Sequence, residues 1–315
     1  MKKELGITIL LIVLCATTAI LNHRFLGAAN LENMARLIGM YGIFSIGCGL
    51  IIITGGIDLS VGSVFALQGV LLAMALRDWH WYWPVAVLAT IVGVMLLGLF
   101  HGVMVAKVGM QPFIVTLCGL LFYRGLARFI AGDETKGFGS EGFGMLRRLA
   151  TGDVGPVPMP FVILIVVAVI SYVALHRSVY GRYLFAVGCN EDAARFSGIN
   201  SRVIIGSAYV VSMALAGVSG VLIAFYTNSI SPANHGSFYE LYGIAAAVLG
   251  GCSLRGGEGS ILGIVIGAAL LQVLQNLVNL LGIPSALNFS VMGAVIFFGV
   301  LVDQVLRQRR GRRAQ

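Results

Sequence analysis

The strongest constraint on this chain is a 40-residue stretch, Leu37 to Leu76, that contains no lysine and no arginine. At about 1.5 Å per residue, helices of that combined length reach roughly 60 Å, which is two crossings of a hydrocarbon core about 30 Å thick. The sequence Thr54-Gly55-Gly56-Ile57-Asp58-Leu59-Ser60-Val61-Gly62-Ser63 falls where one crossing ends and the next begins. Asp58 is the only carboxylate in the stretch, and an ionisable residue among membrane segments is a functional candidate.

Composition indicates a membrane protein throughout. Apolar residues make up 58% and charged residues 11% of the 315 residues, whereas soluble domains carry about 25% charged residues. We expect an all-α membrane protein with about ten transmembrane helices, at residues 6–21, 37–54, 61–76, 84–106, 111–131, 160–175, 202–224, 239–251, 260–281 and 288–306. The segment 239–251 is too short for a straight crossing, so we expect it to be tilted, broken or re-entrant.

The distribution of basic residues predicts the orientation of the chain. An even number of spans places both termini on one side, and that side carries most of the 21 lysines and arginines: Lys2, Lys3, Lys107, Arg177, Arg182, Arg195, Arg202, Arg255, Arg307, Arg309, Arg310, Arg312 and Arg313. The positive-inside tendency therefore predicts that both termini are cytoplasmic. The net charge of +8 follows from the same tendency and does not indicate a nucleic-acid partner.

We expect one transmembrane domain, residues 1–306. Two of its loops are longer than ordinary turns. The loop 132–159 is predicted to be external and carries four acids, so it either faces an extracytoplasmic partner or is a solvated connector: Asp133, Glu134, Glu141 and Asp153. The loop 176–201 is predicted to be cytoplasmic. Residues 307–315 form a basic cytoplasmic tail.

The cytoplasmic loop contains the pattern of a short helix. Asn190 is a suitable N-cap, and Glu191 and Asp192 place negative charge on the first turn, where the helix dipole favours it. Strong helix formers follow, and Gly198 suits a left-handed stop. The complete candidate segment is Asn190, Glu191, Asp192, Ala194, Arg195, Phe196, Ser197, Gly198 and Ile199. A helix of two turns is marginal in water, so it needs to pack against the membrane domain or against a partner.

No catalytic or metal site is expected. The chain lacks the G-x-x-x-x-G-K-[ST] loop, so we do not expect it to hydrolyse nucleotide. Its five histidines and five cysteines show no metal-ligand spacing, and His101 is expected to make a polar contact between helices. At membrane depth we expect Asp58 as the acid, with Asp303 near the cytoplasmic end of the last span. So few ionisable groups argue against an ion-coupled carrier.

Polar uncharged residues and glycine turns are the candidates for a pathway or gate. The segment from Gly250 to Ser260 echoes the segment from Gly55 to Ser63, and such turns leave backbone N–H groups free for polar ligands. Amides also recur on the ninth expected span, where Gln272 precedes three of the candidates. The candidates are Gly55, Gly56, Asp58, Ser60, Ser63, Gln68, Gln275, Asn276 and Asn279. The alternatives are a capped tight turn and hydrogen bonds that join helices.

These motifs resemble a known family. The segment Thr54 to Ser63 is similar to the signature of the inner-membrane permeases of ribose-, galactose- and rhamnose-type sugar ABC transporters. The segment from Gly188 to Ile199 resembles the part of those permeases that contacts the ATPase, and Gly250 to Gly259 resembles a further block of the family. Cys189 departs from the pattern, where a glycine or another small residue is usual.

The resemblance implies a permease subunit of an ABC importer, with a membrane fold of the vitamin B12-importer type (type II) in a bacterial inner membrane. It implies three kinds of partner besides the bilayer: a pair of ATPase subunits that bind ATP and magnesium, a second permease copy, identical or not, and a periplasmic or lipid-anchored sugar-binding protein. No cofactor is expected on this chain. The alternatives are a branched-chain amino acid permease of the same superfamily and a secondary sugar carrier.

Overall fold

The computed structural model describes residues 2–139 and 142–284, together with Leu287, Ser290, Val291, Gly293, Ala294 and Phe297. Within this part of the chain, seven helical segments are long and apolar enough to cross a membrane. Their helices are α1 (Lys2–Leu21), α2 (Ala28–Ile53), α4 (Trp83–Val103), α5 (Pro112–Ala131), α7 (Met159–Tyr172), α10 (Ser201–Thr227) and α12 (Ile261–Leu280). The tail 307–315 and all but five residues of the expected span 288–306 lie outside the described residues.

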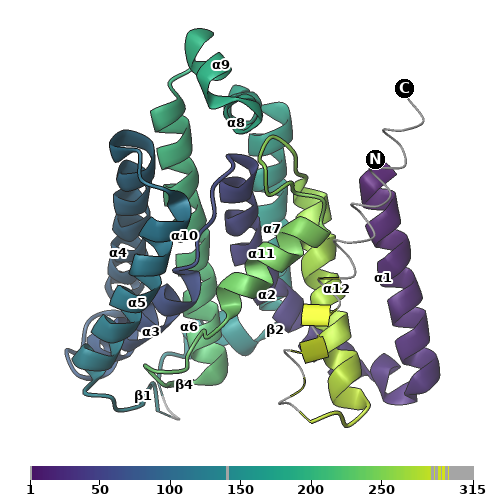
Figure 1. Ribbon diagram of the computed structural model, residues 1–315. Coiled ribbons are helices and arrows are strands. Elements are labelled where there is room, and N and C mark those ends of the chain that lie inside the picture. Colours follow the sequence, from purple (N-terminus) through teal and green to yellow (C-terminus); the bar gives the residue numbers. More distant parts are fainter. Residues whose placement is uncertain are drawn as a thin grey trace.

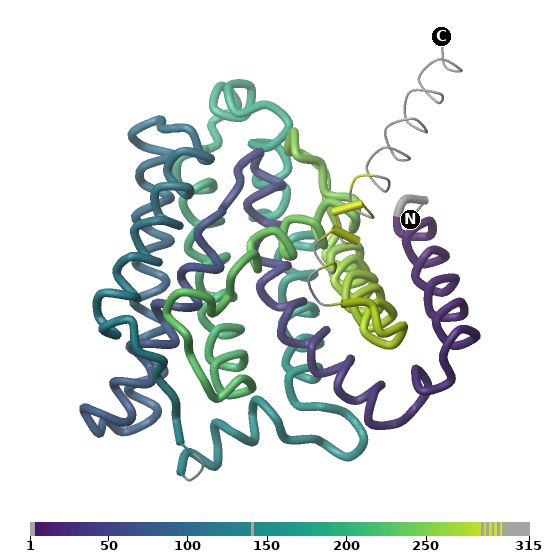
Figure 2. Tube along the Cα trace, turned by 60° about the horizontal axis from the view of Figure 1, so that its bottom comes forward, coloured from purple at the N-terminus to yellow at the C-terminus, as the bar shows by residue number. Residues whose placement is uncertain are grey.

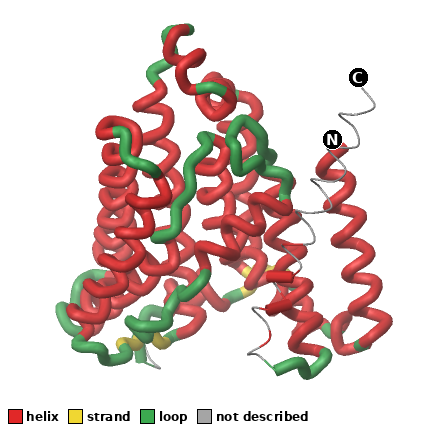
Figure 3. The backbone as a smooth tube through the Cα atoms, in the orientation of Figure 1, coloured by secondary structure: helices red, strands yellow, loops and turns green. Residues whose placement is uncertain are grey.

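Two apolar helices are shorter than a full crossing. α3 (Val61–Arg77) and α11 (Tyr239–Leu249) have 17 and 11 residues, so they reach about 25 and 16 Å. In Figure 1, α11 lies obliquely across the bundle, as expected for a segment that does not cross straight. The connection from α2 to α3 returns from one end of the bundle into its interior before α3 begins (Figure 3).

The remaining elements extend or connect the long helices. Two π-helical turns lengthen α4 and α7, and the others are short helices and two-residue strands: η1 (His23–Leu26), η2 (Met104–Val108), η3 (Val173–Arg177), α6 (Gly144–Thr151), α8 (Val179–Cys189), α9 (Glu191–Phe196), β1 (Lys136–Gly137), β2 (Asp153–Val154), β3 (Val157–Pro158) and β4 (Ser229–Ile230). β1 pairs with β4 and β2 with β3, both antiparallel, with Lys136 opposite Ile230 and Asp153 opposite Pro158.

Helices α2 and α10 form the centre of the bundle, and their close packing uses glycine. A Cβ at Gly47 of α2 would stand 2.9 Å from the Cα of Ser212 on α10, and one at Gly102 of α4 would stand 2.8 Å from the Cα of Gly206. Small residues at such contacts let helix backbones approach closely, where dispersion stabilises the pair. α1 lies at the edge, beside α12 (Figure 2).

The two ends of the bundle carry different structures. The start of α1 lies at the same end as α8 and α9 (Figure 1). The loop 132–159 lies at the opposite end and packs onto the bundle: Phe138 stacks on Phe225 with ring centroids 4.2 Å apart, and Asp153 pairs with Arg36 at 2.9 Å. This loop is therefore a connector that is anchored to the bundle. That an extracytoplasmic partner binds its outer face stays a prediction.

Candidate functional site

The connection between α2 and α3 is held by its own acid. Asp58 is 2% exposed, and its Oδ1 accepts hydrogen bonds from the backbone N–H of Ser60 at 2.8 Å and from the Ser60 hydroxyl at 2.7 Å. The hydroxyl of Ser63 donates to the carbonyl oxygen of Ser60 at 2.7 Å. Hydrogen bonds from an Asp side chain to the residue two positions later fix a turn of the backbone. The geometry favours the interpretation of Asp58 as a cap of the turn before α3, and contact with a substrate stays a prediction.

The other carboxylate oxygen of Asp58 faces a buried histidine. Its Oδ2 lies 3.9 Å from Nδ1 of His101 on α4, and neither atom has a hydrogen-bond partner among the described residues. Nε2 of His101 lies 2.9 Å from the hydroxyl of Tyr123 on α5. Tyr209 on α10 donates to the carbonyl oxygen of Ile57 at 3.4 Å. His101 therefore makes the expected polar contact, and three long helices surround the Asp58 turn.

Three segments far apart in the sequence meet at the end of α2. The backbone N–H of Gly257 donates to the carbonyl oxygen of Ile53 at 2.9 Å. A Cβ at Gly188, near the end of α8, would overlap that same carbonyl oxygen, and one at Gly256 would stand 2.9 Å from the backbone nitrogen of Gly55. Only glycine, which has no Cβ, lets backbones approach this closely. We call this contact the glycine junction; its residues are Ile53, Gly55, Gly188, Gly256 and Gly257.

The glycine junction connects three motifs that the sequence presented separately. Both glycine-rich turns contribute to it, and the third contribution comes from α8, which leads into α9. Gly55 has a φ of +82° and Gly256 a φ of +84°, conformations that favour glycine over every other residue. Cys189 fits beside it, with its Sγ 3.8 Å from the carbonyl oxygen of Gly257. α8 therefore contacts the end of α2, from which the Asp58 turn starts.

The short helix predicted in the loop 176–201 is present as α9. Its N-cap is Asn190, whose side chain accepts a hydrogen bond from the N–H of Ala193 at 2.9 Å. Asp192 and Arg195 form an exposed ion pair at 2.8 Å. Gly198 follows with a φ of +83°. The predicted cap and the predicted left-handed stop are thus confirmed, whereas α8 was not predicted as a separate helix.

The side chains of α9 face in two directions. Ala194 is buried, Ile199 packs against the core, and Glu191 accepts a hydrogen bond from the hydroxyl of Ser201 at 2.9 Å. These contacts fix α9 to the start of α10. Phe196, by contrast, is 89% exposed, so α9 presents a large apolar side chain at the end of the bundle while its other face is anchored.

A second polar cluster lies where the start of α3 meets the segment before α11, and the sequence patterns did not indicate it. Arg124 of α5 donates to the carbonyl oxygens of His235 at 2.7 Å and Pro232 at 3.3 Å, which precede α11. It also donates to that of Gly62, in the first turn of α3, at 3.2 Å. Glu240 is 6% exposed and lies so close that a Cβ at Gly62 would overlap its Oε2. Arg124 therefore joins the start of α3 to the segment before α11.

The expectation that Asp58 is the acid at membrane depth was therefore wrong, because Glu240 is buried there as well. The signal was present in the sequence: Glu240 lies within the expected span 239–251, and Arg124 lies within 111–131. Opposite charges in two apolar segments are expensive to expose to lipid and tend to face one another in the interior. That pairing would have been a basis for predicting the cluster.

The amides of α12 lie apart from the Asp58 turn. Asn276 and Asn30 exchange two hydrogen bonds, at 2.7 and 3.1 Å, which join α12 to the first turn of α2. Asn30 is separated from Thr54 by almost the whole of α2, or about 36 Å. Gln275 is half-buried and Asn279 is exposed. The structure thus gives Asn276 the helix-joining contact, and a role for Gln275 and Asn279 in a pathway stays a prediction.

A polar and aromatic strip follows α2 toward the Arg124 cluster. The hydroxyl of Tyr226 donates to the side chain of Asn33 at 3.0 Å. Two turns along α2, the ring of Tyr41 lies 5.0 Å from that of Tyr239 and 5.5 Å from that of Tyr242. All but Tyr242 are partly exposed. Because hydroxyls and amides are costly to expose to hydrocarbon, such a strip suits a water-filled path or a second protein chain.

Two further candidates, Gln68 and Gly56, have structural contacts in the described chain. Gln68 is 2% exposed and donates from Nε2 to the carbonyl oxygen of Gly217 on α10 at 2.9 Å. A Cβ at Gly56 would stand 2.9 Å from the hydroxyl of Tyr209. Gln68 therefore joins α3 to α10, and Gly56 leaves room for the side chain of Tyr209 on the same helix. Among the described residues, no group of three or more His, Cys, Asp or Glu side chains is arranged to hold a metal ion.

The fold and the site together define a multi-pass helical membrane protein in which broken segments meet inside the bundle. Irregular backbone at membrane depth is tolerated where it is buried in protein or borders a polar path, and transport proteins use it for binding. The class is therefore that of a membrane transport subunit.

Comparison with known proteins gives the family. Residues 30–300 match the family model described as the permease component of branched-chain amino acid transport systems. The chain is 36% identical over 307 residues to the ribose import permease protein RbsC of Bacillus subtilis (strain 168), covering 96% of this chain and 93% of that protein. It is 38% identical over 296 residues to RbsC of Escherichia coli (strain K12), covering 94% and 92%. It is 32% identical over 299 residues to the fructose import permease protein FruF of Bifidobacterium longum (strain NCC 2705), covering 91% and 83%.

The chain belongs to this permease family. Its resemblance to the simple-sugar import permeases is confirmed by relatives that are named for ribose, galactofuranose and fructose. No solved structure matches the chain.

Proposed function

We propose that this chain is the membrane-spanning permease subunit of an ATP-driven ABC importer, and that it translocates a monosaccharide delivered by an extracytoplasmic binding protein. The observation that carries the proposal is the glycine junction, which links α9 to the buried Asp58 turn. The names of the full-length relatives support a sugar as the substrate. They do not favour the branched-chain amino acid alternative.

In this proposal α9 is the contact for the ATPase. The exposed ring of Phe196 docks on a cytoplasmic cassette, and the anchored face of α9 transmits the movement to α10 and, through α8, to the junction. The cassettes bind ATP and magnesium. Because the junction contains the last carbonyl of α2, a small shift of α8 changes the position of the turn that starts α3.

The sugar passes along the polar and aromatic strip and then reaches the contact between the start of α3 and the segment before α11. Tyrosine hydroxyls and the Asn33 amide offer neutral hydrogen bonds, which suit an uncharged, hydroxyl-rich solute. The Arg124 cluster closes the path while the start of α3 remains joined to the segment before α11. A second permease copy, identical or related, forms the other wall.

The proposed assembly also has a fixed orientation. The chain is a type II permease of about ten spans in the bacterial inner membrane, with both termini and α9 in the cytoplasm and the loop 132–159 outside. The start of α1 at the α9 end and the basic residues at that end support this orientation.

The test is reconstitution of the chain in vesicles with its ATPase and its sugar-binding protein. Uptake of radiolabelled D-ribose, D-galactose and D-fructose is measured with ATP, with a protonophore, and without the ATPase. The proposal predicts uptake of at least one sugar that requires ATP and the ATPase and persists with the protonophore. Uptake that needs no ATPase and collapses with the protonophore would identify a secondary carrier instead.

A further inference from the structure

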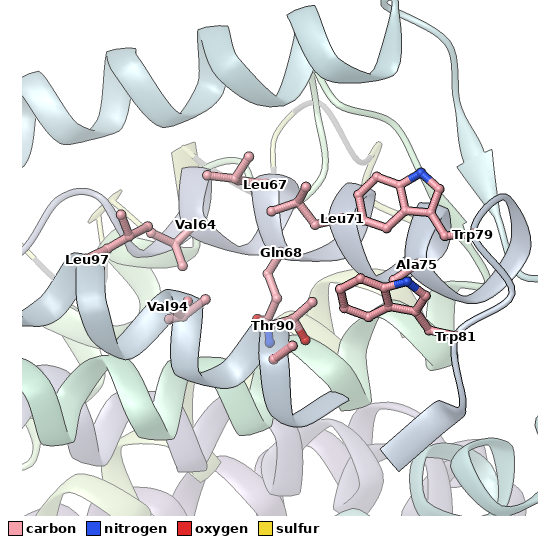
Figure 4. A pocket seen from close by; sticks show the side chains of 12 residues that line it. Val64, Leu67, Gln68, Leu71, Ala75, Trp79, Trp81, Thr90, Val94 and Leu97 are labelled. Atoms are coloured by element: carbon pink, nitrogen blue, oxygen red, sulfur yellow. The ribbon is translucent and has the colours of Figure 1, made fainter. Parts of the chain in front are cut away.

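A hollow of about 260 Å³ lies between α3 and α4. Figure 4 shows its wall, which is made mainly of aliphatic side chains from both helices: Val64, Leu67, Leu71, Val94 and Leu97. Ala89 and Gly93 of α4 leave it open at the helix surface, since both are exposed and a Cβ at Gly93 would meet no atom within 4 Å. The hollow is thus formed by small residues on an otherwise apolar helix face.

The two polar side chains in the wall already have hydrogen bonds within the protein. Gln68 donates from Nε2 to the carbonyl oxygen of Gly217 of α10, and its Oε1, which lies against Gly220 of the same helix, has no hydrogen-bond partner among the described residues. The hydroxyl of Thr90 bonds to the carbonyl oxygen of Val87 at 3.0 Å. The hollow therefore offers little to a sugar. Apolar cavities of about 150 Å³ stay dry and take up small hydrocarbons, so hydrocarbon is the chemistry that fits this larger one.

The mouth of the hollow is marked by two tryptophans. Trp79 and Trp81 follow the end of α3, with ring centroids 5.5 Å apart, and they are 48% and 43% exposed. Figure 4 shows both rings at one end of the hollow. Indole rings concentrate at the boundary between hydrocarbon and headgroups, where the ring contacts chains and the N–H contacts polar groups. The hollow therefore extends from that boundary into the hydrocarbon layer.

The bilayer is what surrounds this part of the protein. α4 belongs to a candidate membrane span and exposes an apolar row at helical spacing, formed by Val85, Leu88, Val92 and Leu96. We propose that the hollow between α3 and α4 binds one acyl chain of a membrane phospholipid, with the headgroup beside Trp79 and Trp81. The bound chain supports α3 along the face that lines the hollow with α4, and the inference does not depend on the transported substrate.

The tryptophans allow a direct test, because the three tryptophans of the chain are residues 79, 81 and 83. The protein, purified in detergent and stripped of lipid, is titrated with phosphatidylglycerol that carries brominated acyl chains, and tryptophan fluorescence is recorded. We expect saturable quenching at one lipid per chain. Gly93→Leu fills the hollow and should abolish the saturable component, whereas Gly6→Leu, which also has open space around the glycine on a membrane helix, should retain it.

The proposal would be overturned by quenching that rises without saturation in the wild-type protein, or by saturable quenching that is equal in Gly93→Leu. Protection by D-ribose would show a sugar site and would overturn it as well. Should Gly93→Leu fail to fold, as judged by thermal unfolding, Ala89→Leu fills the same hollow from the exposed side of α4 and provides the same comparison.

Discussion

Replacing Gly188 by alanine tests the glycine junction directly. The new Cβ would overlap the carbonyl oxygen of Ile53 and stand 2.6 Å from the backbone nitrogen of Gly257, so α8 has to move away from α2. Overpacking of this kind costs about 1–3 kcal/mol. The shift also breaks the hydrogen bond from Gly257 to Ile53, which contributes about 1 kcal/mol. The better helix propensity of alanine offsets up to about 1 kcal/mol, so the net loss is about 1–3 kcal/mol.

The matched control is Gly206→Ala. Gly206 also lies in a helix, α10, but a Cβ there would meet no atom within 4 Å, so we expect unchanged or slightly higher stability. Both variants are compared by thermal unfolding in detergent and by the ratio of sugar uptake to ATP hydrolysis in vesicles. Gly188→Ala should lower the unfolding temperature and the uptake per ATP, whereas Gly206→Ala should lower neither quantity. Wild-type values for Gly188→Ala would refute the junction as a mechanical contact.

Three further substitutions address other parts of the site. Asp58→Ala removes both hydrogen bonds to Ser60 and should cost about 1–2 kcal/mol in thermal unfolding, whereas Asp58→Asn keeps an acceptor and should cost less; a changed KM for sugar with unchanged stability would contradict the cap. Arg124→Met leaves the carbonyl oxygens at the start of α3 and before α11 without their donor and should destabilise the fold by about 2–4 kcal/mol; unaltered stability and uptake would show that Arg124 does not hold these two segments together. For Asn30→Ala and Asn276→Ala, a double-mutant cycle should give a coupling of about 1 kcal/mol; additive effects would show that the pair does not join the helices.

Local features of the site were predictable because they depend on neighbouring residues. The N-cap at Asn190 and the stop at Gly198 follow from residue chemistry within one helical turn, and both are confirmed. A tight turn capped by Asp58 was one of the alternatives that the sequence left open. That the segment 239–251 is too short for a straight crossing was clear from its length alone, and its helix has 11 residues.

The contacts that connect these features were not predictable from one sequence. The position of Gly188 against Ile53 depends on how α8 folds back, and nothing near residue 188 encodes the carbonyl oxygen of a residue so distant in the chain. The same holds for Arg124, whose three acceptors lie in two segments that approach each other only in the folded bundle. The glycines, Arg124 and Glu240 were visible in the sequence, but the backbone groups that Arg124 and the glycines contact were not.

Photo-crosslinking from Phe196 tests whether α9 is the contact for an ATPase. A benzophenone amino acid is placed at Phe196 or, as a matched control, at Phe129 of α5, which is 83% exposed. The chain is then irradiated in membranes together with its ATPase. We expect a crosslink to the ATPase from position 196 and none from position 129. A wild-type level of assembly with no crosslink from 196, or a crosslink from 129 alone, would contradict it.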